Sequence, residues 1–504
     1  MTVRDEPGRE VVLLGDLLDW AAERSADRTA VVHGPRRCTV AELRTASVVA
    51  AATLHGLGVR RGDRVVIVVE DFLDTIAFMF GAARIGAVYV LVDQATPAYA
   101  AQHLLDDSEP RCVVAGEASH PRRCAQESGI PLHAPDCFGR PDPGAPAAPR
   151  PVSYDGVSIL YTSGSTGRPK GVVATHANMV FTAIAIARRL RLREDDVIGC
   201  VLPITFDYGA YQILLGLLSG ATLVWGRGAA AGPGLLSFLR DNAVTVLPAV
   251  PGVSHVLDRL SRRSTEPLPG LRVLTNTGAA MSDELRGRLR AAYPDLQVYL
   301  MFGLTECKRI SILLPEEIDA RPGSVGRALD DTECIVVDAD GRALEPGQVG
   351  ELVVRGPHVT QGYWRAPELT APRFRPRGPM GERVLHTGDR CRLDDAGYLY
   401  FAGRDDDIYK SNGYRTSAVE VALAAEAVPG VSQAHCVPER AGSPAVLAVV
   451  TDLSAAEVRT RLHDYLEWFK VPDLIVVTRS IPLNRNGKAD AEAVRALTSE
   501  RGPV

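Results

Sequence analysis

Apolar residues along this chain form two kinds of pattern. Residues 16–27 (DLLDWAAERSAD) carry apolar side chains at the spacing of one helix face. The segments "DRVVIVVE" and "GAVYVLVD" are short continuous apolar runs, which are typical of strands buried on both faces. Because such strands alternate with helical segments, the pattern predicts an α/β fold class with parallel strands.

The longest apolar stretch covers residues 75–92, and Arg84 and two glycines interrupt it. A membrane-spanning helix needs about 20 predominantly apolar residues in a row. We therefore expect a core helix followed by a buried strand here, and no membrane span.

Turn residues become more frequent further along the chain. A run rich in Pro, Ala and Gly, "GRPDPGAPAAPRP", predicts a surface connection. Beyond it, "GRALEPGQVGELVV" and "GELVVRGPHVTQGYW" predict a β-rich subdomain at about residues 310–400. We expect a large N-terminal domain of α/β subdomains plus this small subdomain, residues 1–404, followed by a small mobile α+β C-terminal domain, residues 405–504.

Length and composition limit the class of protein. A chain of 504 residues is too long for one compact core, and 46% hydrophobic with 23% charged residues is ordinary for a folded soluble protein. The net charge of -5 provides no basic field for nucleic acid or anionic lipid. The charged start, "MTVRDEPGRE", has no apolar signal core, and nine scattered cysteines without a CxxC pair fit reduced thiols. We expect a cytoplasmic protein without nucleic-acid or membrane partners.

Lysine is rare in this chain. Lys and Arg together number 56, yet only five of them are lysines. A compact ammonium that persists against such a bias is expected where the wider guanidinium cannot replace it. These lysines are Lys170, Lys308, Lys410, Lys470 and Lys488.

A loop rich in Gly, Ser and Thr, "YTSGSTGRPKG", occupies residues 161–171. The N–H groups and hydroxyls of such a loop can converge on phosphate oxygens, and a lysine adds charge. The loop has neither the GK[ST] end of a Walker A loop nor a GxGxxG pattern. It follows the strand pattern "VSIL" and precedes "GVVATHANMV", which we expect to open a helix. This setting favours a phosphate loop over a linker.

The loop resembles the phosphate-loop signature of the adenylate-forming superfamily, which includes acyl-CoA synthetases, amino-acid adenylation domains of nonribosomal peptide synthesis and luciferases. Similar motifs follow in the family's order: "LPITFDYGAYQILLGLLSGATLV", "NTGAAMS", "MFGLTE", "GELVVRGPHVTQGYW", "HTGDRCRLDDAGYLYFAGRDDDIYKSNGYR" and "PLNRNGKAD". Several motifs in the right order are far more specific than any one of them. The resemblance covers nearly the whole chain.

This resemblance implies that a carboxylate reacts with ATP to give an acyl-adenylate and pyrophosphate, and that the acyl group then passes to a thiol. Both reactants of the first step are anions, so the site must neutralise charge. Lys488 matches the family lysine that bridges the carboxylate and the α-phosphate. Glu306 matches the carboxylate that coordinates Mg²⁺, and Thr305 lies beside it. One carboxylate plus nucleotide oxygens suffices for Mg²⁺.

The resemblance also implies the contacts to the nucleotide. The loop would surround the phosphates, Asp389 would bind the ribose hydroxyls, and Arg404 would add a ribose or phosphate contact. Small residues in "NTGAAMS" would let the backbone lie against the adenine. The nucleotide-binding residues implied are Thr162, Ser163, Gly164, Ser165, Thr166, Gly167, Lys170, Gly278, Ala279, Ala280, Phe302, Asp389, Phe401 and Arg404.

A moving C-terminal domain is implied as well. Asp405 occupies the family's hinge position, about which the domain would rotate to deliver Lys488 for adenylation and remove it for thiol transfer. After rotation, Gly413 would line the tunnel for the thiol and Arg415 would contact the incoming group.

The sequence restricts the identity of the carboxylate substrate less closely than it restricts the nucleotide contacts. Asp207 matches the aspartate that pairs with the substrate amine in amino-acid adenylation domains, which favours an amino acid, β-amino and other unusual amino acids included. Alternatively, Asp207 caps the helix that follows it. A cation directly after "GLTEC" would meet a second substrate carboxylate or hold an acid in place. The expected substrate-binding residues are Asp207, Tyr208, Thr277, Lys308 and Arg309.

The thiol acceptor is inferred from what the sequence lacks. No carrier-protein segment follows "NGKAD" and no HHxxxDG condensation motif occurs. We expect a freestanding enzyme that loads the phosphopantetheine thiol of a separate carrier protein, with CoA as the alternative acceptor. Two alternatives stay open. One is a ligase that forms an acyl-CoA from a carboxylic acid without an amine, and the other is a catalytically silent member of the family that only binds nucleotide. The presence of Lys488, Glu306 and Asp389 argues against the silent member.

Overall fold

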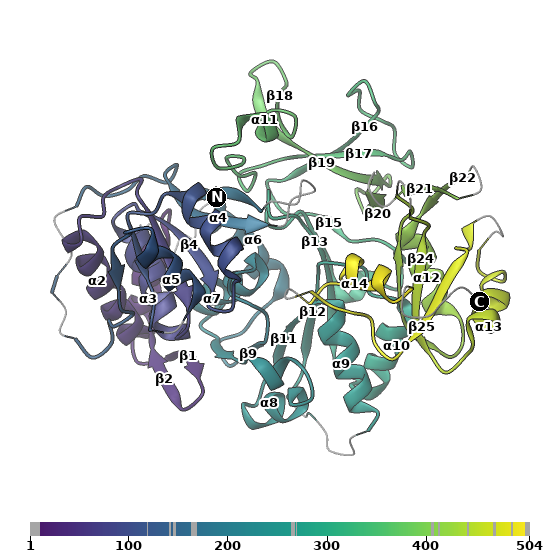
Figure 1. Cartoon of the computed structure of the whole chain (residues 1–504), viewed down its shortest axis with the longest axis horizontal. Helices are drawn as coiled ribbons and strands as arrows, with labels where there is room; N and C mark the ends of the chain where they lie inside the picture. The colour runs from purple at the N-terminus through teal and green to yellow at the C-terminus, as the bar shows by residue number, and fades with distance from the viewer. Residues whose placement is uncertain are drawn as a thin grey trace.

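Two large sheets, a small antiparallel sheet and a C-terminal α+β unit make up the chain (Figure 1). The computed structural model describes residues 11–498 except 118, 141–142, 145–147, 163–168, 264–267, 269, 405–407, 412–413, 441–442, 467–469 and 485–486. The mixed α/β class predicted from the sequence is confirmed.

The first large sheet has six strands in the order β6-β5-β3-β4-β7-β8, and all neighbours are parallel except β7 and β8. One face packs against α2 and α3 and the other against α4 and α5. The strands are β3 (Arg64–Val69), β4 (Val88–Asp93), β5 (Cys112–Val114), β6 (Leu132–His133), β7 (Gly156–Thr162) and β8 (Lys170–Thr175). The helices are α2 (Val40–Gly56), α3 (Phe72–Arg84), α4 (Ala98–Ser108) and α5 (His120–Glu127).

The second large sheet has nine strands in the order β15-β14-β13-β12-β11-β9-β10-β1-β2, parallel from β13 to β1 and antiparallel at both edges. Its strands are β1 (Thr29–His33), β2 (Arg36–Thr39), β9 (Val197–Cys200), β10 (Thr222–Trp225), β11 (Val246–Ala249), β12 (Val273–Asn276), β13 (Gln297–Phe302), β14 (Ser311–Leu313) and β15 (Arg327–Ala328). The associated helices are α1 (Leu14–Ser25), α6 (His176–Leu190), α7 (Asp207–Ser219), α8 (Leu235–Asp241), α9 (Pro251–Ser261) and α10 (Asp283–Ala292).

A small antiparallel sheet stands above the two large ones in Figure 1. It consists of β16 (Glu333–Val337), β17 (Gly350–Arg355), β18 (Phe374–Arg377), β19 (Glu382–Leu393) and β20 (Leu399–Arg404), with the short helix α11 (Pro367–Thr370). The predicted β-rich subdomain is therefore present, but its expected start near residue 310 is wrong. Strands β14 and β15 extend the nine-stranded sheet instead, because they pair next to β13.

The C-terminal unit has its own buried apolar cluster, which includes Val421, Leu447, Val449, Val458 and Leu462. Its elements are the hairpin β21 (Ile408–Ser411) and β22 (Tyr414–Ser417), the sheet β23 (Val431–Val437), β24 (Val446–Thr451) and β25 (Leu474–Thr478), and the helices α12 (Ala418–Ala427), α13 (Ala455–Leu462) and α14 (Ala491–Ala496).

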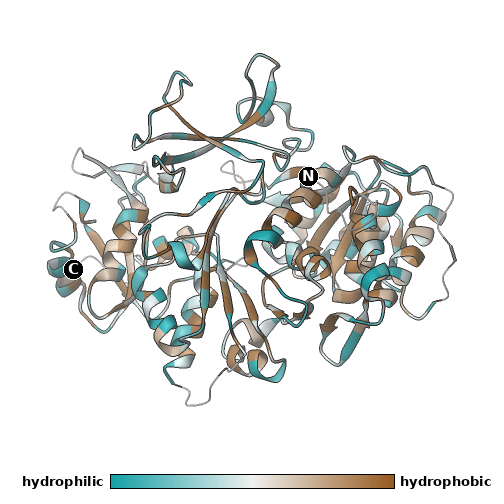
Figure 2. Cartoon of the chain, turned by 180° about the vertical axis from the view of Figure 1, so that it is seen from behind, coloured by the Kyte–Doolittle hydropathy of each residue, from teal (hydrophilic) through white to brown (hydrophobic). Residues whose placement is uncertain are grey.

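Helix α3 and strand β4 form the centre of the N-terminal core, as the apolar stretch over residues 75–92 predicts. A Cβ added at Gly81 would stand 2.8 Å from the backbone nitrogen of Ala51, so the close approach of α3 to α2 requires glycine. Figure 2 shows the strands of the large sheets mostly in brown and the outer helix faces largely in teal. Within the described residues, no helix combines the length and apolarity needed to cross a membrane.

One local prediction is wrong. The segment after the loop, "GVVAT", was expected to open a helix, but it is strand β8, antiparallel to β7, and the helix α6 begins only at His176. Its β-branched residues extend the hairpin, and Thr175 then caps α6 by accepting the Asn178 amide at 3.1 Å.

His176 at the start of α6 is fully buried, and its Nδ1 accepts the backbone amide of Leu14 at 3.2 Å. Burial lowers the pKa of His176 from 6.5 to about 4. The unfolded chain binds this proton more tightly, so the stability due to the neutral ring is complete above pH 6.5 and is lost as the pH falls toward 4.

We expect the free energy of unfolding to fall by about 2 kcal/mol between pH 7 and pH 5 through this one group. Substitution His176→Gln keeps an acceptor without the titration, so its melting temperature should fall less over that range. Calorimetry of both proteins between pH 7.5 and 5 measures this, and parallel pH profiles would contradict the assignment to His176.

Candidate functional site

Glu306 lies in a polar cluster just after β13. The Tyr363 hydroxyl donates to its Oε1 at 2.6 Å, and the Lys170 ammonium lies 3.2 Å from the same oxygen. Lys170 also donates to the Tyr363 hydroxyl at 2.7 Å. Burial raises the pKa of Glu306, but Lys170 and Tyr363 outweigh it and the net pKa is lowered. The carboxylate therefore stays ionised, which is the state that binds a cation.

Thr360 fixes the backbone beneath this carboxylate. Its amide and hydroxyl donate to the Glu306 carbonyl oxygen at 3.0 and 2.8 Å. Thr305 precedes Glu306 in the same partly buried turn. Sequence reasoning missed Thr360 and Tyr363, although both lie in the motif "GELVVRGPHVTQGYW" that it had recognised.

The predicted phosphate loop begins and ends beside Glu306. Thr162 at the end of β7 pairs with Lys170 at the start of β8, so the strands hold the two ends of the loop together. The Thr162 hydroxyl is buried and has no hydrogen-bond partner among the described residues. The loop residues named from the sequence, Ser163, Gly164, Ser165, Thr166 and Gly167, lie outside the described part of the chain.

Asp389 and Arg404 meet across β19 and β20, with Arg404 Nε donating to Asp389 Oδ1 at 2.6 Å. Burial raises the pKa of Asp389, although Arg404 opposes the shift. The second oxygen, Oδ2, is buried without a partner in the described residues. The rings of Phe302 and Phe401 lie close by, 5.5 Å apart between centroids. The structure thus brings together four residues that the sequence assigned to one nucleotide.

Residues 278–280 form an exposed turn directly after β12. Gly278 has a φ of 91°, and Asn276 Nδ2 donates to the Ala279 carbonyl at 3.0 Å, which fixes the turn that also contains Ala280. Asn276 Oδ1 is buried and unpartnered among the described residues. The Asn276 side-chain amide therefore has a buried acceptor beside exposed backbone, an arrangement that fits hydrogen bonding to the edge of a polar heterocycle.

Lys488 reaches the same region from the C-terminal unit, whose yellow segment before α14 crosses toward β12 in Figure 1. Its Cε lies 3.2 Å from where a Cβ at Gly278 would stand, and its ammonium lies 5.5 Å from the Phe206 ring centroid. Burial lowers the pKa of Lys488, and Asp207 opposes the shift. The structure places the predicted catalytic lysine beside Gly278 and over the Phe206 ring.

A tight turn between β13 and β14 carries Glu306, Lys308 and Arg309. A Cβ on Gly303 would stand 2.3 Å from the Lys308 carbonyl oxygen, so only glycine fits there. Lys308 has a φ of 62°, in the left-handed region that non-glycine residues rarely adopt. Such backbone conformations persist where surrounding structure imposes them, and they concentrate at functional sites.

A small cavity lies beside this turn, between α6, α7 and β13. Asp207 is the first residue of α7, where its Oδ1 accepts the Tyr208 amide at 2.8 Å and its carboxylate makes no further capping bond within the described residues. The capping alternative therefore accounts for one carboxylate oxygen only. The lining residues are Ile186, Leu190, Asp207, Tyr208, Tyr211, Gln212, Leu215, Met301, Lys308 and Arg309.

The wall of this cavity is held by polar contacts to β12. The Tyr208 hydroxyl donates to the Thr275 carbonyl at 3.1 Å, and burial raises the pKa of this hydroxyl. The Arg309 guanidinium lies 5.4 Å from the Tyr208 ring centroid and donates through Nη1 to the Thr277 hydroxyl. The substrate residues predicted from the sequence thus lie around or next to one cavity.

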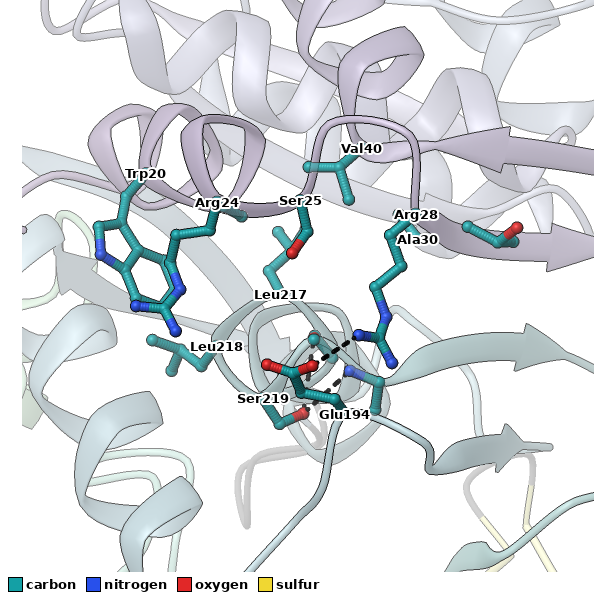
Figure 3. Close-up of a pocket in the computed structure, with 15 residues that line it drawn as sticks. Trp20, Arg24, Ser25, Arg28, Ala30, Val40, Glu194, Leu217, Leu218 and Ser219 are labelled. Carbon is teal, nitrogen blue, oxygen red and sulfur yellow. Dashed lines mark hydrogen bonds and ion pairs between the residues drawn. The ribbon is translucent and has the colours of Figure 1, made fainter.

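A second pocket lies at the opposite end of α7, between that helix and α1 (Figure 3). An ion pair of 3.1 Å between Arg28 and Glu194 crosses it, and Arg24 covers the Trp20 ring at 5.0 Å. No residue predicted for nucleotide or substrate lines it. The two pockets share no lining residue, so this pocket is not part of the site.

Only some of the residues assigned to the hinge and to thiol transfer belong to the described part of the chain. Asp405 and Gly413 lie outside the described residues. The backbone of Arg415 belongs to β22, opposite Lys410 of β21. These assignments stay predictions.

The chain is similar to known proteins that bind nucleotides. The profile of the AMP-binding enzyme family matches residues 18–364. CymA of Salinispora arenicola, described as a probable nonribosomal peptide synthetase, is 33% identical over 489 residues. That alignment covers 95% of this chain but only 6% of CymA, so the chain spans a small part of this relative.

Two solved structures are similar over most of their lengths. The complex of VinN with L-aspartate is 34% identical with a TM-score of 0.70, covering 78% of this chain and 98% of VinN. ATP-bound MatB from Rhodopseudomonas palustris is 25% identical with a TM-score of 0.83, covering 96% of this chain and 98% of MatB. Both are similar to this chain in fold and in sequence.

The side chains of the site fit ATP, which is bound in the MatB structure, and they also fit Mg²⁺. Three buried polar atoms have no partner in the described residues: Thr162 Oγ1, Asn276 Oδ1 and Asp389 Oδ2. They lie at the base of the phosphate loop, beside the 278–280 turn and next to Arg404, where phosphate, base and ribose would each meet one. Glu306 offers the ionised oxygen that Mg²⁺ prefers.

We expect Tyr363→Phe to destabilise the protein by about 1.5–3 kcal/mol, since a buried charged acceptor loses its hydrogen bond. Tyr400→Phe is the matched control, because the Tyr400 hydroxyl makes a longer bond of 3.2 Å to Asp394. Chemical denaturation of both variants measures the difference. Equal free energies of unfolding would show that Tyr363 does not support Glu306.

Proposed function

The chain belongs to the family of AMP-binding enzymes, and from this premise we propose that it activates an amino acid with ATP as its aminoacyl-AMP and then transfers the aminoacyl group to the phosphopantetheine thiol of a separate carrier protein. The match over residues 18–364 and the similarity to ATP-bound MatB support the activity of an adenylate-forming ligase. The choice of an amino acid is carried by one observation: Asp207 lines the small cavity beside the Lys308 turn, and only one of its carboxylate oxygens accepts a hydrogen bond within the described residues.

An ammonium is the natural partner for that oxygen. Asp207 is half-buried, and a carboxylate that is partly removed from water is costly without a counter-charge, whereas a charged hydrogen bond contributes roughly 1.5–3 kcal/mol. Lys488 and Lys308 both interact with Asp207 electrostatically, but neither lies within ion-pair distance of it in the described residues. A substrate ammonium would occupy the remaining position.

In adenylation, a carboxylate oxygen attacks the α-phosphorus, a new P–O bond forms, and the bond to pyrophosphate breaks. The ammonium of Lys488 would lie between the two anions and lower their repulsion. Burial strengthens this interaction because no bulk water screens it. Asp207 would orient the amino acid so that its carboxylate faces Lys488.

The nucleotide would be held by residues from three sheets. Asp389 and Arg404 would bind the ribose, Phe302 and Phe401 would lie beside it, and the 278–280 turn would face the adenine. Lys170 and Thr162 would hold the phosphates, and Glu306 would bind Mg²⁺, which neutralises phosphate charge. Thr305 would contact the phosphates next to Glu306.

The second half-reaction requires Lys488 to leave. We propose that the C-terminal unit, residues 405–504, rotates about Asp405 against the core, residues 1–404, and brings Gly413 and Arg415 to the thiol path. The thiolate then attacks the acyl carbonyl and AMP leaves. The peptide-synthetase relatives support a carrier protein as acceptor, and we propose that the protein works in the cytoplasm, where ATP is supplied.

Asp207→Ala should remove the preference for the amine. We expect pyrophosphate exchange with the preferred amino acid to fall by about 10- to 100-fold, while its des-amino analogue is affected little. The two rates are measured for wild type and variant. If the variant keeps the native ratio, the amine does not pair with Asp207.

Lys488→Ala should abolish pyrophosphate exchange while ATP still binds, because its ammonium acts between the reacting anions. Lys470→Ala is the matched control, since Lys470 in the same C-terminal unit pairs with Glu420 at 2.6 Å. Exchange assays and calorimetric ATP titration separate the two effects. Exchange by Lys488→Ala at the wild-type rate would contradict the mechanism, and transfer to CoA in preference to a carrier protein would revise the acceptor.

A further inference from the structure

Two adjacent cations are buried in the substrate cavity. Lys308 is 6% exposed and Arg309 is 5% exposed, and both line the cavity together with Asp207. Within the described residues neither makes an ion pair with a carboxylate. Burial of a cation without a counter-charge costs several kcal/mol, so the cavity is prepared for an anion.

The nearby acids do not supply that anion. Glu306 is bound by Lys170 at 3.2 Å and by Tyr363 at 2.6 Å. One carboxylate oxygen of Asp207 accepts a hydrogen bond from the Tyr208 amide at 2.8 Å. One carboxylate cannot balance two buried cations, and under the proposed function it is needed by the substrate ammonium.

The donors of these cations are also incompletely used. Arg309 Nη1 donates to the Thr277 hydroxyl, but its buried Nε has no partner in the described residues. The ammonium of Lys308 makes no hydrogen bond within the same residues, although three donors are available. The strained φ of 62° at Lys308 shows that the turn holds this side chain in place at an energetic cost.

We propose that the substrate carries a second carboxylate, which Lys308 and Arg309 bind while Asp207 pairs with its ammonium. Tyr208, Tyr211 and Met301 line the same cavity, whose empty volume of about 310 Å³ is at the lower end of the range for small-molecule pockets. The substrate class is therefore a small dicarboxylic amino acid of about the size of aspartate. This inference rests on the proposed amino-acid activation, and the binding of L-aspartate by VinN agrees with it.

A substrate series tests each contact separately by pyrophosphate release. L-Aspartate and L-glutamate carry both carboxylates and the amine, L-asparagine and L-alanine lack the second carboxylate, and succinate lacks the amine. We expect at least one dicarboxylic amino acid to react about 10- to 100-fold faster than its amide and than L-alanine. Equal rates for aspartate, asparagine and alanine would overturn the second-carboxylate inference and leave the proposed function intact.

Two variants give a readout that does not depend on activity. Lys308→Met removes a buried unpaired charge at similar volume, so the melting temperature of the free protein should rise by at least about 2 °C. L-Aspartate at millimolar concentration should raise the melting temperature of the wild type and not that of Lys308→Met or Arg309→Gln. Arg327→Gln, on exposed β15, is the control and should respond as wild type does.

The outcomes separate the two proposals. A wild-type thermal shift with L-aspartate that persists in Lys308→Met and Arg309→Gln would show that these cations do not bind the ligand. Succinate as effective as aspartate would show that the amine is not read, which contradicts the proposed function but not the second carboxylate. No pyrophosphate release with any acid would overturn both.

Discussion

The arrangement depends on one constraint, the concentration of positive charge in a space with little water. Four cations converge near the end of β13, namely Lys170, Lys308, Arg309 and Lys488, while Glu306 and Asp207 are the acids among them. Anionic reactants would offset this excess of positive charge. A carboxylate and a nucleotide triphosphate are such reactants, and their mutual repulsion is what an adenylating enzyme must overcome.

Separate parts of the fold supply this charge, so their packing is part of the chemistry. The hairpin β7–β8 supplies Lys170, the turn after β13 supplies Glu306, Lys308 and Arg309, and the C-terminal unit supplies Lys488. The small sheet adds Asp389 and Arg404. The C-terminal unit that carries Lys488 has an apolar cluster of its own, which fits the proposed departure of Lys488 in the second half-reaction.

Much of this could be predicted from the sequence, and the failures have physical reasons. Continuous apolar runs predicted the parallel sheets, because a strand that is buried on both faces carries apolar side chains at successive positions. The strand "GVVAT" was missed because periodicity alone does not separate a short apolar run in a strand from one in a helix. Motif spacing placed Lys488, Glu306 and Asp389, but not Tyr363, which is 57 residues from the Glu306 that it binds. The burial of Lys308 and Arg309 was also beyond the sequence, because charged residues lie on the surface in most proteins.

The claim that a buried cation pair and a single aspartate select the substrate is tested most directly by a crystal structure with a non-hydrolysable aspartyl-adenylate analogue. The account predicts the ligand's ammonium within hydrogen-bond distance of Asp207 and its free carboxylate against Lys308 and Arg309. A ligand carboxylate directed into solvent, with both cations still unpaired in the cavity, would contradict it.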